Sequence, residues 1–238
     1  MTVSAMASPL VAGDLPVNLR QVARDAGLGF PASMRELLSR RPFSLTVRLQ
    51  VVYVEPTPSF TVPRSITATL RRQLVRMRQL YTAADIGVEL AGTQRWVGTE
   101  AELLSDLDIG TAWTSSTDPK PCTGTLTVWQ EQLYAHRDGM AEHDVAIYFV
   151  RSIVPAFAGC ATHPDGVPGA AVADSATQWT LAHEVGHVLG LPHIDQNGPP
   201  QPTRLMTRVG TFKILVVPTI SQPEIDTMRS SPFLTGNP

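Results

Sequence analysis

The chain has 238 residues, of which 43% are hydrophobic and 17% charged, and its formal net charge is −2. This length suits one well-packed domain or two closely joined subdomains. No apolar run approaches the roughly 20 residues of a membrane-spanning helix. The net charge gives no electrostatic reason to expect a nucleic acid or an anionic membrane as a partner. The composition is therefore typical of a globular protein without a membrane span.

The first 42 residues are expected to form an N-terminal extension, which could be a leader, a linker or a propeptide-like segment. Two short helical pieces are predicted in it, separated by glycine and proline. Its first stretch lacks a basic region ahead of the apolar residues, so it is a poor match to a Sec signal peptide. If the protein is secreted, we expect a route other than Sec.

An early strand and a long helix are predicted from periodicity. Residues 44–55 alternate apolar and polar side chains and are rich in β-branched types, which favours a half-buried strand. Residues 65–81 place apolar side chains at helical spacing, which predicts a long helix lying on a sheet. Its arginines point largely away from the apolar stripe, and a solvated outer face accounts for them without any ligand. These are Arg71, Arg72, Arg76 and Arg78.

Shorter elements complete the predicted order. A helix that begins near Ser175 or Thr177 contains the most informative stretch of the chain, and a loop rich in Pro, Gly and Asn follows it. A last helix is predicted from Gln222 to Ser230, with Ser221 and Glu224 as a capping box. The remaining elements are strands at 85–90 and 143–150, helices near 99–106 and 128–137, and short extended pieces at 157–162 and 169–174.

The two cysteines, Cys122 and Cys160, form no CxxC motif, so neither a zinc knuckle nor a redox dithiol is indicated. They could pair in an oxidising compartment, or both could stay reduced.

Half of the six histidines lie in the stretch TLAHEVGHVLGLPH, residues 180–193. His183 and His187 are four residues apart, so one face of a helix brings both imidazoles to the same metal ion. His193 is close enough in sequence to supply a third nitrogen. Three protein ligands leave the fourth tetrahedral position open, which is the arrangement of a catalytic zinc.

Glu184 and Gly190 fit the same site. Glu184 is rotated about 100° from His183 around the helix axis, where its carboxylate can accept a proton from a zinc-bound water instead of ligating the metal. Gly190 stands three residues after His187, where a helix that ends abruptly often needs a positive φ. The pattern HExxHxxGxxH therefore predicts a zinc-dependent hydrolase.

The stretch HEVGHVLGLPH, followed by RLMTR, resembles the signature of the metzincin zinc peptidases, in which a methionine forms a tight turn beneath the metal. The resemblance implies a set of roles. His183, His187 and His193 would bind one catalytic Zn²⁺, Glu184 would be the general base, Gly190 the turn residue and Met206 the methionine of the Met-turn.

The resemblance also implies an α+β fold, with a twisted, mostly parallel mixed sheet, a long backing helix, an active-site helix and a small irregular C-terminal subdomain that ends in a helix. The corresponding division is an extension at 1–42, an N-terminal catalytic subdomain at 43–190 and a C-terminal subdomain with the Met-turn at 191–238. Arg208 stands where some metzincins carry a tyrosine. The chain is thus nearer the families that lack it, such as matrixins and adamalysins, and its subfamily is unassigned.

The implied function is that of a zinc-dependent endopeptidase acting on a protein or peptide substrate. The substrate would lie antiparallel to an exposed edge strand, either 157–162 or 169–174, and residues after Met206 would line the specificity pocket. A non-catalytic binding module that keeps the fold is the alternative. His163 and Asp165 are explained by a turn, so we expect no second, structural metal.

The third zinc ligand can be tested directly. In a different zinc-peptidase layout a glutamate on a later helix is the third ligand, and Glu224 would be the candidate. We expect His193→Ala to lower the zinc content sharply and Glu224→Ala to leave it unchanged, because a helix cap accounts for Glu224. Elemental analysis of the purified variants measures this, and the reverse result would move the site to the other layout.

Overall fold

The computed structural model describes residues 43–55, 64–109, 122, 126–194, 199–208 and 210–236. The predicted extension at 1–42 and its two helical pieces lie outside the described residues, as does part of the predicted loop after His193. Within the described ranges, none of the helices combines the length and the apolar character that crossing a membrane requires.

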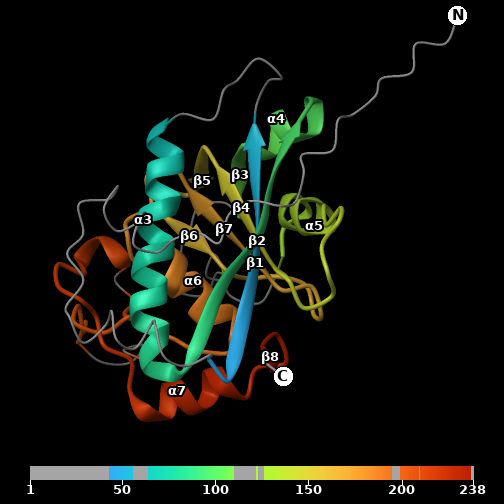
Figure 1. Ribbon diagram of the computed structural model, residues 1–238. Coiled ribbons are helices and arrows are strands. Elements are labelled where there is room, and N and C mark those ends of the chain that lie inside the picture. The colour runs from blue at the N-terminus through green and yellow to red at the C-terminus, as the bar shows by residue number, and fades with distance from the viewer. Residues whose placement is uncertain are drawn as a thin grey trace, which may run out of the picture. The chain divides into compact units, whose positions relative to one another are not determined.

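A mixed, mostly parallel sheet carries the fold (Figure 1). Its strands lie in the order β2 (Ile86–Val97), β1 (Leu45–Glu55), β4 (Val145–Val150), β7 (Gly169–Ala173) and β6 (Gly159–Cys160). The first four are parallel to their neighbours, β6 is antiparallel at the edge, and β8 (Thr235–Gly236) pairs antiparallel with the start of β1. The predicted α+β class with a mostly parallel mixed sheet is confirmed.

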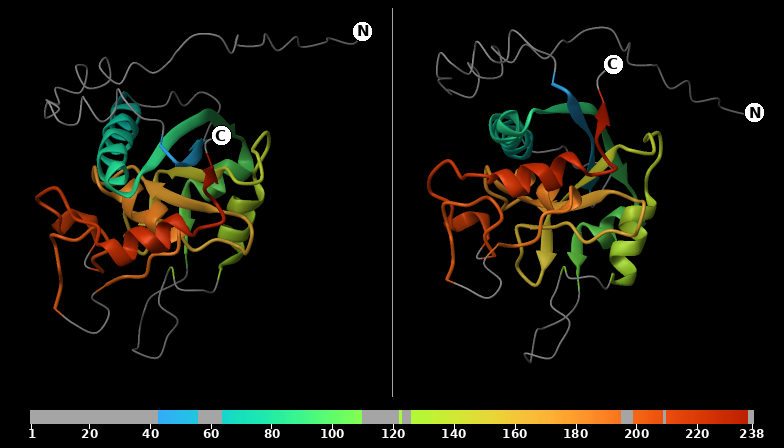
Figure 2. Two further views of the ribbon diagram at one scale, coloured as in Figure 1. Left: turned by 60° about the horizontal axis from the view of Figure 1, so that its bottom comes forward. Right: turned by 90° about the horizontal axis from the view of Figure 1, so that it is seen from below.

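Helices cover both faces of this sheet (Figure 2). Side chains of α3 (Arg64–Tyr81) and α6 (Thr180–Val188) form one hydrophobic core with the sheet. Side chains of α4 (Thr99–Leu104) and α5 (Val128–Ala135) form the other. Every residue of β4 is buried and its side chains alternate between the two cores, as expected for a parallel strand covered on both sides.

The structure extends one predicted strand and shortens one predicted helix. The strand expected at 85–90 continues to Val97 because β1 pairs with it along its whole length, with a register shift that places Gly92 opposite Gln50. A Cβ at Gly92 would lie 2.7 Å from the Gln50 amide oxygen, so the absent side chain allows the strand to continue there. The helix expected at 99–106 ends at Leu104 instead.

A second, two-stranded sheet was not predicted. It pairs β3 (Asp106–Asp108) with β5 (Ser152–Val154) in parallel. Each strand has three residues, which is too short for a hydrophobic period to be recognised. Arg151 pairs with Asp106 at the start of this small sheet.

The active-site helix begins at Thr180, so the predicted start near Ser175 or Thr177 is wrong. The preceding residues form turns. The Ala176 N–H donates to the Ala173 carbonyl, and the Thr177 N–H donates to the Thr180 hydroxyl at 3.0 Å. These local hydrogen bonds compete with helix formation until Trp179.

The last helix, α7 (Gln222–Arg229), agrees closely with its prediction. The Ser221 N–H donates to the Glu224 carboxylate at 2.7 Å, and the capping box expected from Ser221 and Glu224 is present.

The predicted helix at 128–137 is also present as α5, which ends at Ala135 and carries a capping box of its own from Thr127 and Gln130.

Cys122 and Cys160 are joined by a disulfide, with their Cα atoms 5.6 Å apart. The pairing settles the alternative that the sequence left open. Cys160 belongs to β6, so the bond attaches the edge strand to a residue 38 positions earlier in the chain.

This disulfide should contribute measurably to stability. Closing a loop of 38 residues restricts the unfolded chain. We therefore expect reduction to lower the free energy of unfolding by about 3–4 kcal/mol. Urea unfolding with and without a reducing agent measures this, and the double variant Cys122→Ser/Cys160→Ser should be insensitive to the reductant. An unchanged midpoint for the reduced wild type would contradict the expectation.

Candidate metal centre

Two hydrogen bonds hold the active-site helix in place. The Tyr81 hydroxyl at the end of α3 donates to the Ala182 carbonyl at 2.9 Å. The hydroxyl groups of Thr180 and Thr211 lie 2.7 Å apart, which joins the start of α6 to a later loop. Both contacts are buried, so the helix that carries His183 and His187 is fixed from two sides.

The helix ends in a Schellman motif built on Gly190. The Leu191 N–H donates to the Gly186 carbonyl and the Gly190 N–H to the His187 carbonyl, each at 2.9 Å. Gly190 has a φ of 99°, a region that favours glycine because it lacks a Cβ. The chain thereby reverses within three residues and returns His193 to the side of the helix that carries the other two histidines.

The three imidazoles converge on one point. The Nε2 atoms of His183 and His187 are 3.2 Å apart, those of His187 and His193 3.2 Å, and those of His193 and His183 3.3 Å. A tetrahedral zinc ion with Zn–N bonds of about 2.0–2.1 Å holds its nitrogen ligands about 3.3–3.4 Å apart. The triangle therefore fits zinc, and among the described residues this cluster is the one that could hold a metal ion.

Backbone carbonyls orient two of the rings. His183 Nδ1 lies 2.7 Å from the Leu205 carbonyl oxygen, and His187 Nδ1 lies 2.6 Å from that of Leu191. Each Nδ1 must carry the proton to donate, which leaves the lone pair of Nε2 directed at the common point. Burial, followed by the neighbouring His183 and His193, lowers the pKa of His187 to about 3. Its ring is thus neutral, as metal binding requires.

Met206 packs directly beneath the metal-binding stretch of α6. Its side chain is fully buried, and a Cβ added at Gly186 would lie 2.9 Å from the Met206 sulfur. The Ile194 N–H donates to the Met206 carbonyl at 3.1 Å. The turn that contains Leu205 and Met206 thus contacts both the helix and the residue after His193.

Glu184 lies between the helix and the edge strand. Its side chain is buried, and burial raises the pKa of Glu184 to about 8. A Cβ at Gly159 in β6 would lie 2.5 Å from a Glu184 carboxylate oxygen, so only glycine leaves room for the carboxylate in this position. The sequence does not single out Gly159, since a lone glycine in a short extended segment gives no signal of what it contacts.

The histidines and Glu184 open into a cleft of about 790 Å³. One side is formed by residues 152–162, which include β5 and β6, and the other by Arg208 and the residues 210–212. Of the two candidate edge segments, 157–162 contains the outermost strand β6, whereas β7 in 169–174 is interior. Residues after Met206 line the cleft, and their role in a specificity pocket stays a prediction.

The other candidate residues lie elsewhere. The Glu224 carboxylate accepts from the Ser221 N–H and hydroxyl and pairs with Arg204, and it is outside the histidine cluster. His163 contacts the Pro164 carbonyl at 2.9 Å, next to the turn at Asp165. His136 stacks on Trp96 with ring centroids 4.0 Å apart, and His143 is exposed.

No protein-family model matches the chain. No curated protein matches it either. Among solved structures, metalloproteinase II from Bacteroides fragilis is similar with a TM-score of 0.47 and 15% sequence identity, over 80% of this chain and 54% of that one. A chaperone–substrate complex gives a TM-score of 0.41 and 12% identity, over 78% and 34% of the two chains. This chain therefore spans about half the length of the metalloproteinase, and similarity at this level carries no weight for function.

The Schellman turn should matter for metal binding beyond its effect on stability. We expect Gly190→Ala to lower the free energy of unfolding by about 1 kcal/mol, because alanine is strained at positive φ. It should also weaken zinc binding, because the strain shifts the turn that delivers His193. Zinc titration against a competing chelator measures the second effect.

Gly139→Ala is the matched control. Gly139 also has a positive φ, of 71°, and a Cβ there would meet nothing within 4 Å. This variant should lose stability but keep the zinc affinity of the wild type. Equal zinc affinities for the Gly190 and Gly139 variants would show that the turn does not position His193.

Proposed function

We propose that the protein is a zinc-dependent endopeptidase. The observation that carries this proposal is the triangle of Nε2 atoms, with sides of 3.2–3.3 Å, beside a buried carboxylate that is not part of it. Three nitrogen ligands leave one position of a tetrahedral ion open, which favours a catalytic over a structural zinc. His183, His187 and His193 would hold the ion.

A bound zinc ion supplies Lewis acidity, which activates a water molecule and polarises a carbonyl group. Glu184 is the general base in this proposal. Its carboxylate takes the proton from the attacking water and passes it to the amine nitrogen that leaves. The contact with Gly159 limits where the carboxylate can move, so the proton acceptor is held beside the histidines while the substrate enters.

A peptide substrate would bind along β6, whose antiparallel pairing with β7 leaves its other side at the edge of the sheet. Gly190 and Met206 support the site from below by the Schellman turn and by packing against Gly186. In this proposal the subdomain at 43–190 supplies the edge strand and the helix. The subdomain at 191–238 supplies the Met-turn and the opposite side of the cleft.

A non-catalytic binding module is the second candidate. The buried Glu184 speaks against it, because burying a carboxylate costs stability and a docking protein gains nothing from that cost.

Replacement of the general base separates the two candidates. We expect Glu184→Gln to lower kcat by about 10²–10⁴-fold on an unstructured protein substrate, because the amide cannot accept the proton. Zinc content should stay that of the wild type, since Glu184 is not a ligand. Glu142→Gln, at an exposed glutamate, is the matched control and should keep full activity. If the zinc-loaded wild type and Glu184→Gln both fail to cleave the substrate, the result would favour the binding module.

A further inference from the structure

Residues 205–208 and 210–219 belong to a loop that is closed at its base and anchored by buried side chains. The Leu205 N–H donates to the Thr219 carbonyl at 3.2 Å, and Arg204 and Thr219 form a β-bridge. Thr211 and Ile214 are buried, and Thr211 is the residue that contacts Thr180 of α6. The loop is therefore held at its base and at two buried positions within it.

Apolar side chains project from this loop. Phe212, Leu215, Val216 and Val217 are exposed by 61%, 90%, 54% and 50%. They are four of the nine large hydrophobic residues that the described part of the chain leaves exposed, and they lie within six consecutive positions. Single exposed apolar residues are ordinary, but a contiguous group marks an interaction surface. Phe212 also lines the cleft, so we give the name apolar tip to the other three residues, Leu215, Val216 and Val217.

The loop that carries the apolar tip has an excess of positive charge in its sequence. The sequence from Leu205 to Pro223 contains Arg208 and Lys213 and no Asp or Glu. Lys213 lies within the loop itself, with its amino group 5.3 Å from the centre of the Phe212 ring. The net charge of −2 for the chain conceals this local excess of cations.

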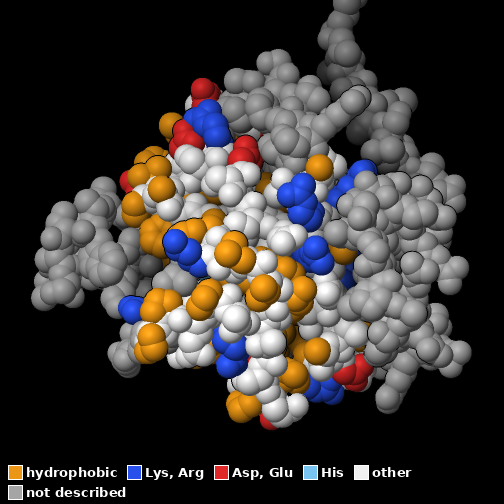
Figure 3. Space-filling view, turned by 90° about the vertical axis from the view of Figure 1, so that its left-hand side faces the viewer, with side chains coloured by type: hydrophobic (Ala, Val, Ile, Leu, Met, Phe, Trp, Pro, Cys, Tyr) orange, Lys and Arg blue, Asp and Glu red, His pale blue; other side chains and the backbone are white. Residues whose placement is uncertain are grey.

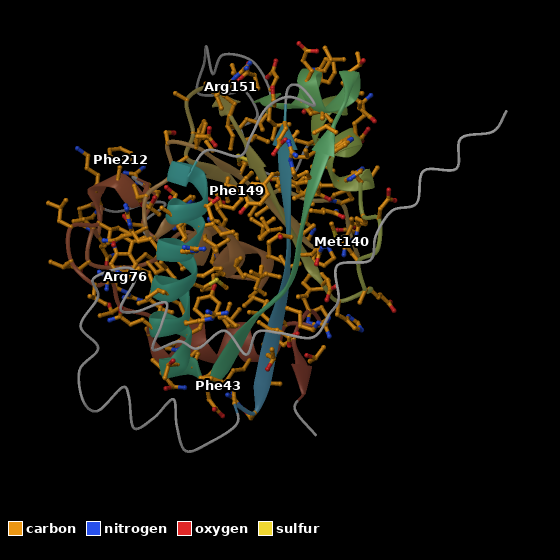
Figure 4. All side chains as sticks on the ribbon, turned by 45° about the horizontal axis from the view of Figure 1, so that its top comes forward. Phe43, Arg76, Met140, Phe149, Arg151 and Phe212 are labelled. Carbon is orange, nitrogen blue, oxygen red and sulfur yellow. A yellow bond between two sulfur atoms is a disulfide. The ribbon has the colours of Figure 1, made fainter. Side chains whose placement is uncertain are left out.

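The outer face of α3 continues the positive surface. Arg76 donates to Gln178 at 3.1 Å and lies over the Trp179 ring, and Trp179 precedes Thr180, which contacts the loop. Arg72 is exposed one helical turn away. Within the described ranges, neither arginine forms an ion pair with a carboxylate. Figure 4 shows Arg76 and Phe212 on the same side of α3.

Figure 3 faces this side of the molecule. Across its middle, hydrophobic side chains alternate with Lys and Arg, while Asp and Glu lie toward the edges of the view. Aliphatic side chains that project outward next to cations match the chemistry of an anionic bilayer surface, which has an apolar interior beneath a layer of negative headgroups.

We propose that the apolar tip inserts into the surface of an anionic membrane, with Lys213, Arg72 and Arg76 meeting the lipid headgroups. This inference goes beyond the peptidase function and requires neither zinc nor catalysis. We favour a lipid surface over a polypeptide partner because Leu215 is exposed by 90% and Lys213 lies in the same loop, a combination that suits anionic headgroups above an apolar interior. Such insertion would hold the protein at a membrane surface without the use of a spanning helix from the described part of the chain.

Vesicle sedimentation of the full chain tests the proposal. We expect binding to phosphatidylcholine vesicles that contain phosphatidylserine, weaker binding to phosphatidylcholine alone, and a decrease with salt. Leu215→Ser should lower the partition coefficient about tenfold, and Lys213→Gln about fivefold. The fluorescence of Leu215→Trp should shift to the blue on addition of the same vesicles, because the indole enters an apolar environment.

Leu103→Ser is the matched control, because Leu103 on α4 is exposed by 59% and lies outside the loop. It should bind vesicles like the wild type, and circular dichroism should show that both serine variants stay folded. The proposal is overturned if the wild type does not bind vesicles. It is also overturned if Leu103→Ser reduces vesicle binding as much as Leu215→Ser does. The proposal is also overturned if Leu215→Ser binds vesicles like the wild type but has a raised KM for a protein substrate. That result would mean that the apolar tip binds a polypeptide. The Glu184→Gln variant should bind vesicles as tightly as the wild type. The vesicle test can therefore succeed or fail independently of the peptidase test.

Discussion

The mutual approach of three imidazole nitrogens is the constraint on which the site depends. His183 and His187 donate from Nδ1 to backbone carbonyls, so their Nε2 lone pairs face each other at 3.2 Å. Such an arrangement is repulsive unless a cation lies between the rings. The surrounding structure holds the three rings close together. Tyr81 and Thr211 anchor α6, and Met206 packs against Gly186.

The parts of the fold that are local in the sequence could be predicted. The spacing of His183, His187 and His193 places three rings at one point because helical geometry and a glycine turn are both short-range effects. The capping box of α7 and the apolar stripe of α3 could be predicted because they are also short-range patterns in the sequence. The strand β4 was recognised because its continuous apolar run is typical of a strand that is buried on both faces.

The parts that depend on distant contacts could not be predicted. The register of β1 and β2 decides that the second strand extends to Val97, and no pattern in that segment specifies its partner. Neither the pairing of Cys122 with Cys160 nor the contact of Gly159 with Glu184 has a signature along the chain. The start of α6 was missed for a different reason, because the Thr177 and Thr180 hydrogen bonds favour a turn over an early helix.

The pairing of β8 with β1 has a consequence for the order of folding. The Thr235 hydroxyl donates to the Thr46 carbonyl across 189 positions, and Arg229 reaches back to the Ala84 carbonyl and the Ser44 hydroxyl. Closing so large a loop in an unfolded chain carries a high entropic cost, which falls once the intervening residues are ordered. We therefore expect α7 and β8 to attach late in folding, after the parallel core has assembled.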